Sequence, residues 1–260
     1  MNDGLALEAR SLTVRFGGVV ALLETSIGIP ANQVSAVIGP NGAGKTTLFN
    51  AICGFVRPQS GEILYQGRTL SGVRPDQLTG LGISRTLQGL GLWPGLTVVE
   101  NVMAGALRRE RPGWAWAMLG LPRADHDDDR ARGAAVGVLS ELGVERYADA
   151  YPGSLPYGVQ KWVALARALA CRPSLLLLDE PASGLTQGEI KELGQRLRGW
   201  RTMMTIALVE HRLDLVMAVS DHITVLDFGQ VIASGTAQEV QADPAVASAY
   251  LGEELEPADA

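Results

Sequence analysis

The chain has 260 residues, 47% hydrophobic and 19% charged, and is therefore long enough to bury a core in one or two domains. Its formal net charge of −6 argues against a large nucleic-acid footprint. It has no apolar run long enough to cross a bilayer and no charged-then-apolar N-terminal leader, so we expect a soluble cytoplasmic chain whose membrane role, if any, comes through a partner. In such a compartment Cys53 and Cys171 are expected to be buried thiols rather than a disulfide.

The N-terminal segment is typical of two strands joined by a glycine turn. Leu5–Phe16 alternates well enough for a strand, and Val19–Leu22 predicts a short second strand. Phe16 has two interpretations that the sequence leaves open. Its ring either packs into the core or offers a face on which a base stacks, a contact worth about 1–3 kcal/mol.

A glycine-rich loop follows an apolar strand predicted at Val34–Ile38. The loop fits the pattern G-x-x-x-x-G-K-[ST] with Gly39, Pro40, Asn41, Gly42, Ala43, Gly44, Lys45, Thr46 and Thr47. A helix predicted at Thr46–Cys53 completes a strand–loop–helix unit, whose backbone N–H groups can surround phosphate oxygens. Lys45 would supply a charge to the β- and γ-phosphates, and the Thr46 hydroxyl can ligate Mg²⁺. The segment predicts a nucleoside triphosphate site rather than a bare glycine turn.

The pattern changes from strands to helices after the glycine loop. Residues 61–65 predict a strand that closes a small antiparallel sheet, and Gly82–Leu87 predicts a strand ending at Gln88. Thr97 begins a helical region, because Glu100 three residues later completes a capping box.

An unusual segment lies inside the helical region. Trp114, Trp116 and Met118 form either a satellite core or an exposed docking surface, and the sequence does not choose between them. The acidic run Asp125–Asp129 is expected to be a solvated helix start rather than a metal site.

Two carboxylates follow a buried strand of four leucines, Leu175–Leu178. Asp179 would reach Mg²⁺ directly or through water, and Glu180, which points to the other side of the strand end, could polarise an attacking water. The alternative for the pair is a helix cap at the strand end. His211 follows the strand Thr205–Val209 and is a candidate contact for a γ-phosphate.

The remainder of the chain alternates between strands and helices. The predicted elements are helices at Thr186–Trp200 and Leu213–Val219, strands at Ile223–Leu226 and Val231–Ser234, and a frayed acidic tail at Gly252–Ala260.

Together these residues resemble the ATP-binding cassette family, the ATPase subunits of membrane transporters, over nearly the whole chain. The resemblance implies that Phe16 stacks on adenine, that Gln88 touches Mg²⁺ or water and reports to the membrane domain, and that His211 is the switch histidine. It makes Asp179 the metal aspartate and Glu180 the catalytic glutamate. The implied fold is a P-loop α/β fold of the ABC ATPase type. Its mainly parallel core and antiparallel β subdomain would occupy 1–88 and 171–251, a helical subdomain 89–170, and an acidic tail 252–260.

One departure from the family pattern lies in its signature segment. The positions are Leu155, Pro156, Tyr157, Gly158 and Val159, where the family usually has Leu-Ser-Gly-Gly-Gln, or Tyr at the third place. Proline offers neither the hydroxyl nor the N–H of serine. A signature acts on the nucleotide site of the partner cassette, so a homodimer would carry the defect at both sites. The importers that this chain resembles form heterodimers, and we therefore expect a heterodimer in which only the partner's site is impaired.

The subgroup is indicated by Asn50–Phe55, Arg85–Gln88, Val209–His211 and Leu226–Gly229, which look like the branched-chain amino acid uptake subfamily, a group that also contains urea and short-amide importers. The resemblance implies Mg²⁺-dependent ATP hydrolysis, transmembrane permease partners, a second cassette, a peripheral place on the cytoplasmic face of the membrane, and no nucleic-acid partner.

Two rival functions remain. The first is a soluble ABC ATPase working on ribosomes or DNA, a class that usually has two cassettes or long coiled-coil insertions. The second is a P-loop kinase or GTPase, which does not explain Gln88, the helical insertion and His211 together.

Overall fold

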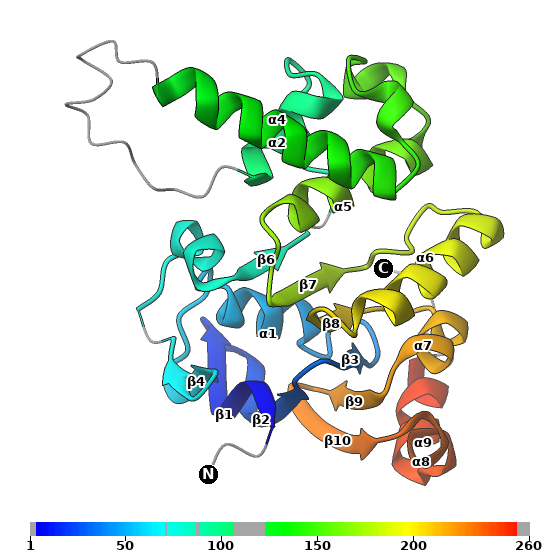
Figure 1. The fold of residues 1–260 in the computed structure, drawn as a ribbon. Helices are drawn as coiled ribbons and strands as arrows, with labels where there is room; N and C mark the ends of the chain where they lie inside the picture. Colours follow the sequence, from blue (N-terminus) through cyan, green and yellow to red (C-terminus); the bar gives the residue numbers. More distant parts are fainter. Residues whose placement is uncertain (1–3, 71, 87–88, 107–122, 254–260) are drawn as a thin grey trace. The chain divides into compact units, whose positions relative to one another are not determined.

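The computed structural model describes residues 4–70, 72–86, 89–106 and 123–253 (Figure 1). The chain divides into two compact units. The first comprises Met1–Leu78, Leu177–Ser183 and Gln187–Ala260, and the second comprises Thr79–Leu176 and Gly184–Thr186. The second unit contains the whole predicted insertion at 89–170 and begins ten residues before it, at Thr79.

The first unit contains an antiparallel sheet with strand order β2-β1-β4-β5. Its strands are β1 (Leu5–Phe16), β2 (Val19–Pro30), β4 (Ser60–Tyr65) and β5 (Arg68–Thr69). The prediction of a short second strand is wrong, because β2 continues to Pro30 and pairs with β1 along its length. Polar Glu24 and Thr25 interrupt the apolar pattern there. Thr25 pairs with Leu12 of β1, and Glu24 has φ 49° where the register shifts between Leu12 and Val14.

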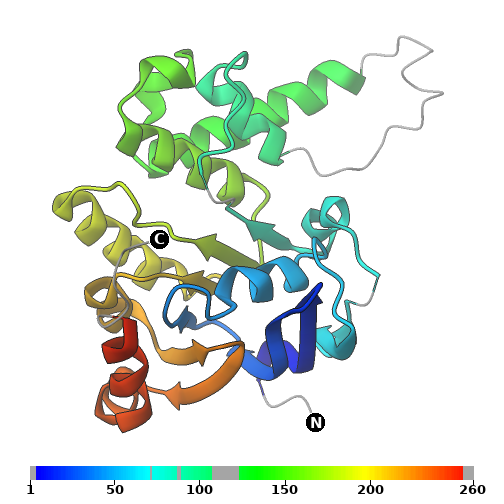
Figure 2. The same ribbon diagram turned by 180° about the vertical axis from the view of Figure 1, so that it is seen from behind.

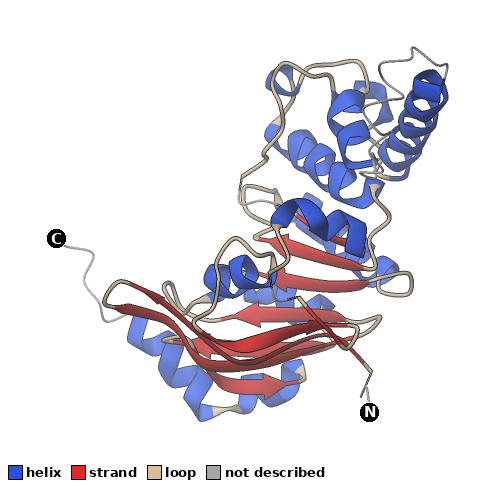
Figure 3. Cartoon of the chain, turned by 90° about the vertical axis from the view of Figure 1, so that its left-hand side faces the viewer, coloured by secondary structure: helices blue, strands red, loops and turns tan. Residues whose placement is uncertain are grey.

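A second sheet has the order β10-β9-β3-β8-β7-β6 (Figure 3 draws the strands of both sheets in red). Its strands are β3 (Val34–Ile38), β6 (Ile83–Arg85), β7 (Leu175–Asp179), β8 (Thr205–Val209), β9 (His222–Asp227) and β10 (Gln230–Gly235). β3 pairs in parallel with both β8 and β9, and β10 is antiparallel to β9. Every residue of β3, β7 and β8 is buried, which explains their mainly apolar sequences.

Helices accompany the strands of the first unit: α1 (Lys45–Ile52), α6 (Gln187–Trp200), α7 (Leu213–Val219), α8 (Ala237–Ala242) and α9 (Pro244–Glu253). The first three were predicted within two residues. α8 and α9 were not predicted, although Thr236 and Glu239 form a full capping box at the start of α8. Both contact β10 and are coloured red in Figure 1.

The second unit is mainly helical, with α2 (Val98–Ala106), α4 (Arg123–Glu141) and α5 (Tyr157–Ala170) packed on one another (Figure 2). The predicted capping box is present: the Thr97 N–H donates to Glu100 Oε2 at 2.7 Å, and the Thr97 hydroxyl donates to the same oxygen. These two hydrogen bonds lower the pKa of Glu100. The acidic run lies in the first turns of α4. Short 3-10 turns occur at Pro75–Leu81, Glu145–Tyr147 and Pro152–Ser154.

Four further features bear on the sequence predictions: the tryptophan segment, the two cysteines, membrane-spanning helices and metal-binding clusters. Trp114, Trp116 and Met118 lie outside the described residues. Cys53 and Cys171 are buried thiols that are not joined in a disulfide, as expected. Within the described ranges, no helix combines the length and the apolar character that crossing a membrane requires. The same ranges contain no cluster of three or more His, Cys, Asp or Glu side chains suited to a metal ion.

Candidate nucleotide site

The parallel strands of the first unit bring the predicted site residues to one edge of the sheet. In the register, Val37 of β3 lies opposite Val209 of β8, and Ile38 lies opposite Val225 of β9. The glycine loop after β3 and His211 after β8 therefore emerge on the same side. Loops at the carboxyl ends of parallel strands are where α/β sheets bind their ligands.

The glycine loop fits tightly against the rest of the first unit. Gly39 has φ 146°, and a Cβ atom there would lie 2.0 Å from the carbonyl oxygen of Leu226. Gly44 has φ 99°, and its Cβ would lie 2.4 Å from the carbonyl oxygen of Ala21. These approaches exclude any side chain at either position. The β9–β10 turn also holds the loop, because the N–H of Gly229 donates to Ala43 O at 3.0 Å.

Lys45 and the start of α1 complete the loop. The Lys45 Nζ donates to the carbonyl oxygens of Gly39 at 2.6 Å and Pro40 at 2.7 Å, so the ammonium folds back over the loop. Gly44 is the N-cap of α1, and no side chain caps this helix end. The backbone N–H groups of the first turn, including those of Thr46 and Thr47, point toward the loop. Because the N-cap residue is a glycine, it provides no side chain that could accept a hydrogen bond from them. Backbone N–H groups and a lysine in this arrangement suit a phosphate group.

Asp179 and Glu180 lie at the end of β7, beside β8 in the sheet. Asp179 is 4% exposed. Glu180 has φ 47°, a left-handed conformation that costs a non-glycine residue about 1–3 kcal/mol and persists only where neighbours hold it. Its N–H donates to Val209 O at 2.9 Å, which ties the glutamate to the end of β8. Both carboxylates therefore share an edge with the glycine loop.

Sequence reasoning missed Glu210, the residue between β8 and His211. Its side chain is 0% exposed, and its Oε1 accepts the N–H of Ala182 at 2.6 Å. Its Oε2 accepts the N–H groups of His211 at 3.1 Å and Arg212 at 3.2 Å. The His211 side chain is 59% exposed, and its Nδ1 lies 3.9 Å from Glu210 Oε2. The available signal was a charged residue placed directly after a fully buried strand.

Two other predicted residues have a simpler outcome. Phe16 is 52% exposed at the end of β1, so the interpretation that it packs in the core is wrong and its ring is accessible. Gln88 lies outside the described residues.

The signature segment lies in the second unit, whereas the glycine loop, Asp179, Glu180 and His211 lie in the first. Pro156 is the N-cap of α5 and provides no side-chain cap. Gln160 Nε2 donates to Leu155 O at 2.9 Å and so fastens the segment to the first turn of α5. The Tyr157 ring lies against Gly184, where an added Cβ would come within 2.5 Å of Tyr157 Cε1.

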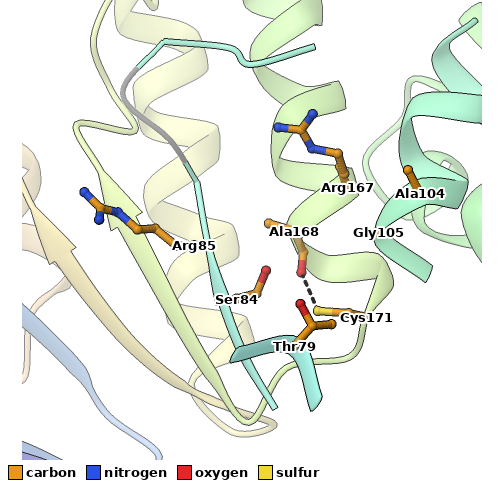
Figure 4. A pocket seen from close by; sticks show the side chains of 8 residues that line it. All are labelled: Thr79, Ser84, Arg85, Ala104, Gly105, Arg167, Ala168 and Cys171. Atoms are coloured by element: carbon orange, nitrogen blue, oxygen red, sulfur yellow. Dashed lines mark hydrogen bonds between the residues drawn. The ribbon is translucent and has the colours of Figure 1, made fainter. Parts of the chain in front are cut away.

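A pocket of about 210 Å³ opens in the second unit among residues of β6, α2 and α5 (Figure 4). Figure 4 shows the guanidinium groups of Arg85 on β6 and Arg167 on α5 lying apart from each other, so their charges do not converge on one point. Arg167 instead donates from Nη1 to Gly91 O at 2.6 Å and lies 5.1 Å from the centre of the Trp93 ring. Burial lowers the pKa of this guanidinium. Arg167 thus anchors the segment that follows Gln88 to α5.

Comparisons with known proteins place this geometry in a family. The ABC transporter family model matches residues 22–183, and a model for the C-terminal part of branched-chain amino acid ATP-binding cassette transporters matches residues 230–256. A curated relative is the high-affinity branched-chain amino acid transport ATP-binding protein BraF of Pseudomonas aeruginosa. It is 36% identical over 250 residues, which cover 95% of this chain and 98% of the relative.

Solved structures agree with these matches. A nucleotide-free ATP-binding cassette from an ABC transporter aligns with a TM-score of 0.82 at 28% identity, covering 95% of this chain and 98% of that one. A dimeric cassette in a post-hydrolysis state, bound to ADP and Pi, aligns with a TM-score of 0.73 at 25% identity, covering 89% and 98%. Because the family model spans more than half of the chain and the relative nearly all of it, this chain belongs to the ATP-binding cassette family of ABC transporters.

Proposed function

We propose that this chain is the ATP-hydrolysing subunit of a transporter that imports branched-chain amino acids or similar small polar solutes. The observation that carries the proposal is the shared sheet edge, where the glycine loop, two carboxylates and a histidine meet. The cargo rests on the similarity to BraF and on the match at residues 230–256, since no residue of an ATPase subunit needs to touch the transported solute.

Each residue of the candidate site has a chemical role in the proposal. The amides of the glycine loop and Lys45 hold the phosphates of ATP, and Phe16 stacks on the adenine. Glu180 accepts a proton from the water that attacks the γ-phosphate, and His211 donates a hydrogen bond to that phosphate.

Mg²⁺ fits the donor set at this edge. The Thr46 hydroxyl and the Asp179 carboxylate are hard oxygen ligands of the kind that Mg²⁺ prefers, with Gln88 as the third proposed contact. Bound there, Mg²⁺ would neutralise charge that develops on the phosphate oxygens. Asp179 suits this role because its position at the buried end of β7 fixes its carboxylate.

The working unit in the proposal is a pair of cassettes. Residues Leu155–Val159 complete the nucleotide site of the second cassette, while the Lys45–Glu180 site receives the signature of that partner. Pro156 offers no hydroxyl and leaves α5 without a side-chain cap, which supports a heterodimer with one impaired site. The dimeric cassette among the solved relatives supports pairing itself.

Transmembrane permease subunits hold the pair at the cytoplasmic face of the membrane. ATP closes the pair, and hydrolysis with product release reopens it, so that the attached permeases alternate between conformations. The segment containing Trp114, Trp116 and Met118, together with residues near Gln88, is proposed as the docking surface for the permease. A soluble ABC ATPase is the less favoured alternative, because the relatives over nearly the full length are transport proteins.

The test is uptake of labelled solute by cells that lack the gene and carry either the wild-type chain or Lys45→Ala. The proposal predicts that leucine uptake returns with the wild-type chain only, while uptake of an unrelated sugar is the same in both.

A tagged chain should also copurify with permease subunits from solubilised membranes. Normal leucine and urea uptake without the gene, combined with no membrane partner, would contradict the transport role and favour the soluble alternative.

A further inference from the structure

Glu210 is a fully buried carboxylate whose contacts go to two different turns of the nucleotide site. Oε1 accepts the N–H of Ala182, two residues after Glu180, at 2.6 Å. Oε2 accepts the N–H groups of His211 and Arg212 at 3.1 and 3.2 Å. Each oxygen therefore serves one turn, and the side chain spans the gap between them.

The turn that contains Glu180 needs such support. Glu180 has φ 47°, and a strained residue of this kind keeps its conformation only when several contacts fix it. Backbone N–H groups of the turn donate to Val209 O from Glu180 at 2.9 Å, to Glu180 O from Ser183 at 3.2 Å, and to the Glu210 side chain from Ala182. The shortest of the three is the bond to the Glu210 carboxylate.

A buried carboxylate is costly unless its oxygens are hydrogen-bonded. A smaller polar residue or an apolar residue could occupy the position directly after β8. The backbone geometry alone therefore does not require a carboxylate there. Three N–H donors directed at the two oxygens satisfy the carboxylate and at the same time fix the turns that donate them.

We propose that Glu210 is a positioning residue that locks the Glu180 turn to the His211 turn, so that the general base and the γ-phosphate contact are held as one unit. The proposal rests on the function proposed above and deepens it. Glu210 does not touch the substrate; it acts through the backbone on either side of it.

The substitution that tests this is Glu210→Gln, which keeps the volume of the side chain. The amide has one oxygen, so its NH₂ group must face the N–H donors of one turn and lose that connection. Glu210→Ala loses both. The matched control is Glu192→Gln on α6, whose partly exposed carboxylate is bonded by the side chain of Arg196 at 2.7 Å and, within the described part of the chain, by no backbone N–H group.

The first measurement is steady-state ATP hydrolysis by the full-length chain assembled with its partner cassette and permeases. Glu210→Gln should lower kcat about tenfold or more, the effect of one lost hydrogen bond to a charged group, and leave KM within about twofold. Glu192→Gln should leave both unchanged. The proposal is overturned by a kcat within twofold of wild type, or by a rise in KM at constant kcat.

The second measurement asks whether Glu210 acts through Glu180. Adding Glu210→Gln to Glu180→Gln should reduce the remaining rate by less than about twofold, because the residue being positioned is already gone. If the tenfold loss recurs in that background, Glu210 acts by another route and the coupling is wrong.

The third measurement does not depend on ATPase activity. Amide hydrogen exchange should speed up at Ala182, His211 and Arg212 in Glu210→Ala and stay unchanged in Glu192→Gln. Unchanged exchange at Ala182 would overturn the proposal even if the rate falls. If the wild-type assembly hydrolyses no ATP, the proposed function fails, while this exchange measurement still decides the role of Glu210 in holding the turns.

Discussion

Gly39 and Leu226 approach each other so closely that a methyl group on Gly39 would lie 2.0 Å from the carbonyl oxygen of Leu226. This contact joins the glycine loop to the last residues of β9, from which the β9–β10 turn continues to its own hydrogen bond with Ala43. The loop is therefore held by its surroundings before any phosphate arrives.

The first prediction compares two glycines of the loop. Gly39→Ala should weaken ATP binding by about tenfold or more, because the loop must move away from Leu226. Gly42→Ala is the control: Gly42 also has positive φ, 78°, but no atom of the described residues beyond its chain neighbours lies within 4 Å of its Cβ position. The control should lower the free energy of unfolding by the left-handed backbone penalty, about 1–2 kcal/mol, and should weaken ATP binding less than Gly39→Ala, because the loop does not have to move. Titration with a fluorescent ATP analogue measures both. Equal losses of affinity would mean that the Leu226 contact does not set the loop's shape.

The second prediction concerns the lysine of the loop. Lys45→Ala removes an ammonium group that lies over the loop and should lower ATP affinity about ten- to a hundredfold, the range expected for lost charged hydrogen bonds. Lys191→Ala, on the exposed side of α6, should leave the affinity unchanged. Isothermal titration with the ATP analogue checks this, and full affinity without the Lys45 ammonium would remove it from the site.

The nucleotide site was largely predictable from sequence, for identifiable physical reasons. Val34–Ile38 and Leu175–Leu178 are buried on both faces, so their apolar runs indicate strands without knowledge of neighbours. The backbone geometry of the loop requires glycine at particular positions, and the spacing of these glycines is visible in the sequence. Both signals are local.

Other features depend on contacts between distant segments. β2 extends past Leu22 only because β1 lies beside it, and its sequence there has no continuous apolar pattern. The role of Glu210 depends on its hydrogen bond with Ala182, which lies 28 residues earlier in the chain and is not indicated by the local sequence. The side-chain orientation of Phe16 could not be chosen either, since core packing and exposure are both compatible with an aromatic residue at a strand end.

The third prediction concerns the anchor in the second unit. Arg167→Ala loses a charged hydrogen bond to Gly91 O and the contact with Trp93, and should lower the free energy of unfolding by about 2 kcal/mol or more. Arg130→Ala, at an exposed position of α4, should change it by less than about 0.5 kcal/mol. Urea unfolding of both variants decides this. If Arg167→Ala lowers the free energy of unfolding as little as Arg130→Ala does, the segment after Gln88 does not rely on Arg167.

The fourth prediction concerns the unusual signature. A missing hydroxyl–phosphate hydrogen bond costs about 1.5–3 kcal/mol, which is about ten- to a hundredfold in closure of the site it completes. Pro156→Ser combined with Val159→Gln should therefore raise hydrolysis at the partner cassette's site and, if the chain pairs with itself, at both sites. The assay is ATP turnover of the chain alone and with its partner cassette. Brisk hydrolysis by the isolated chain, with no change from the double substitution in either assay, would contradict the asymmetry.

The most direct measurement of the central claim is ATP binding and ATP turnover in Glu180→Gln. The account predicts that the variant keeps wild-type affinity, because every phosphate contact remains, and loses nearly all turnover, because the base is gone. It should also accumulate as a closed, ATP-bound pair of cassettes in size-exclusion chromatography. Near-normal turnover in this variant would contradict the account and take Glu180 out of the catalytic role.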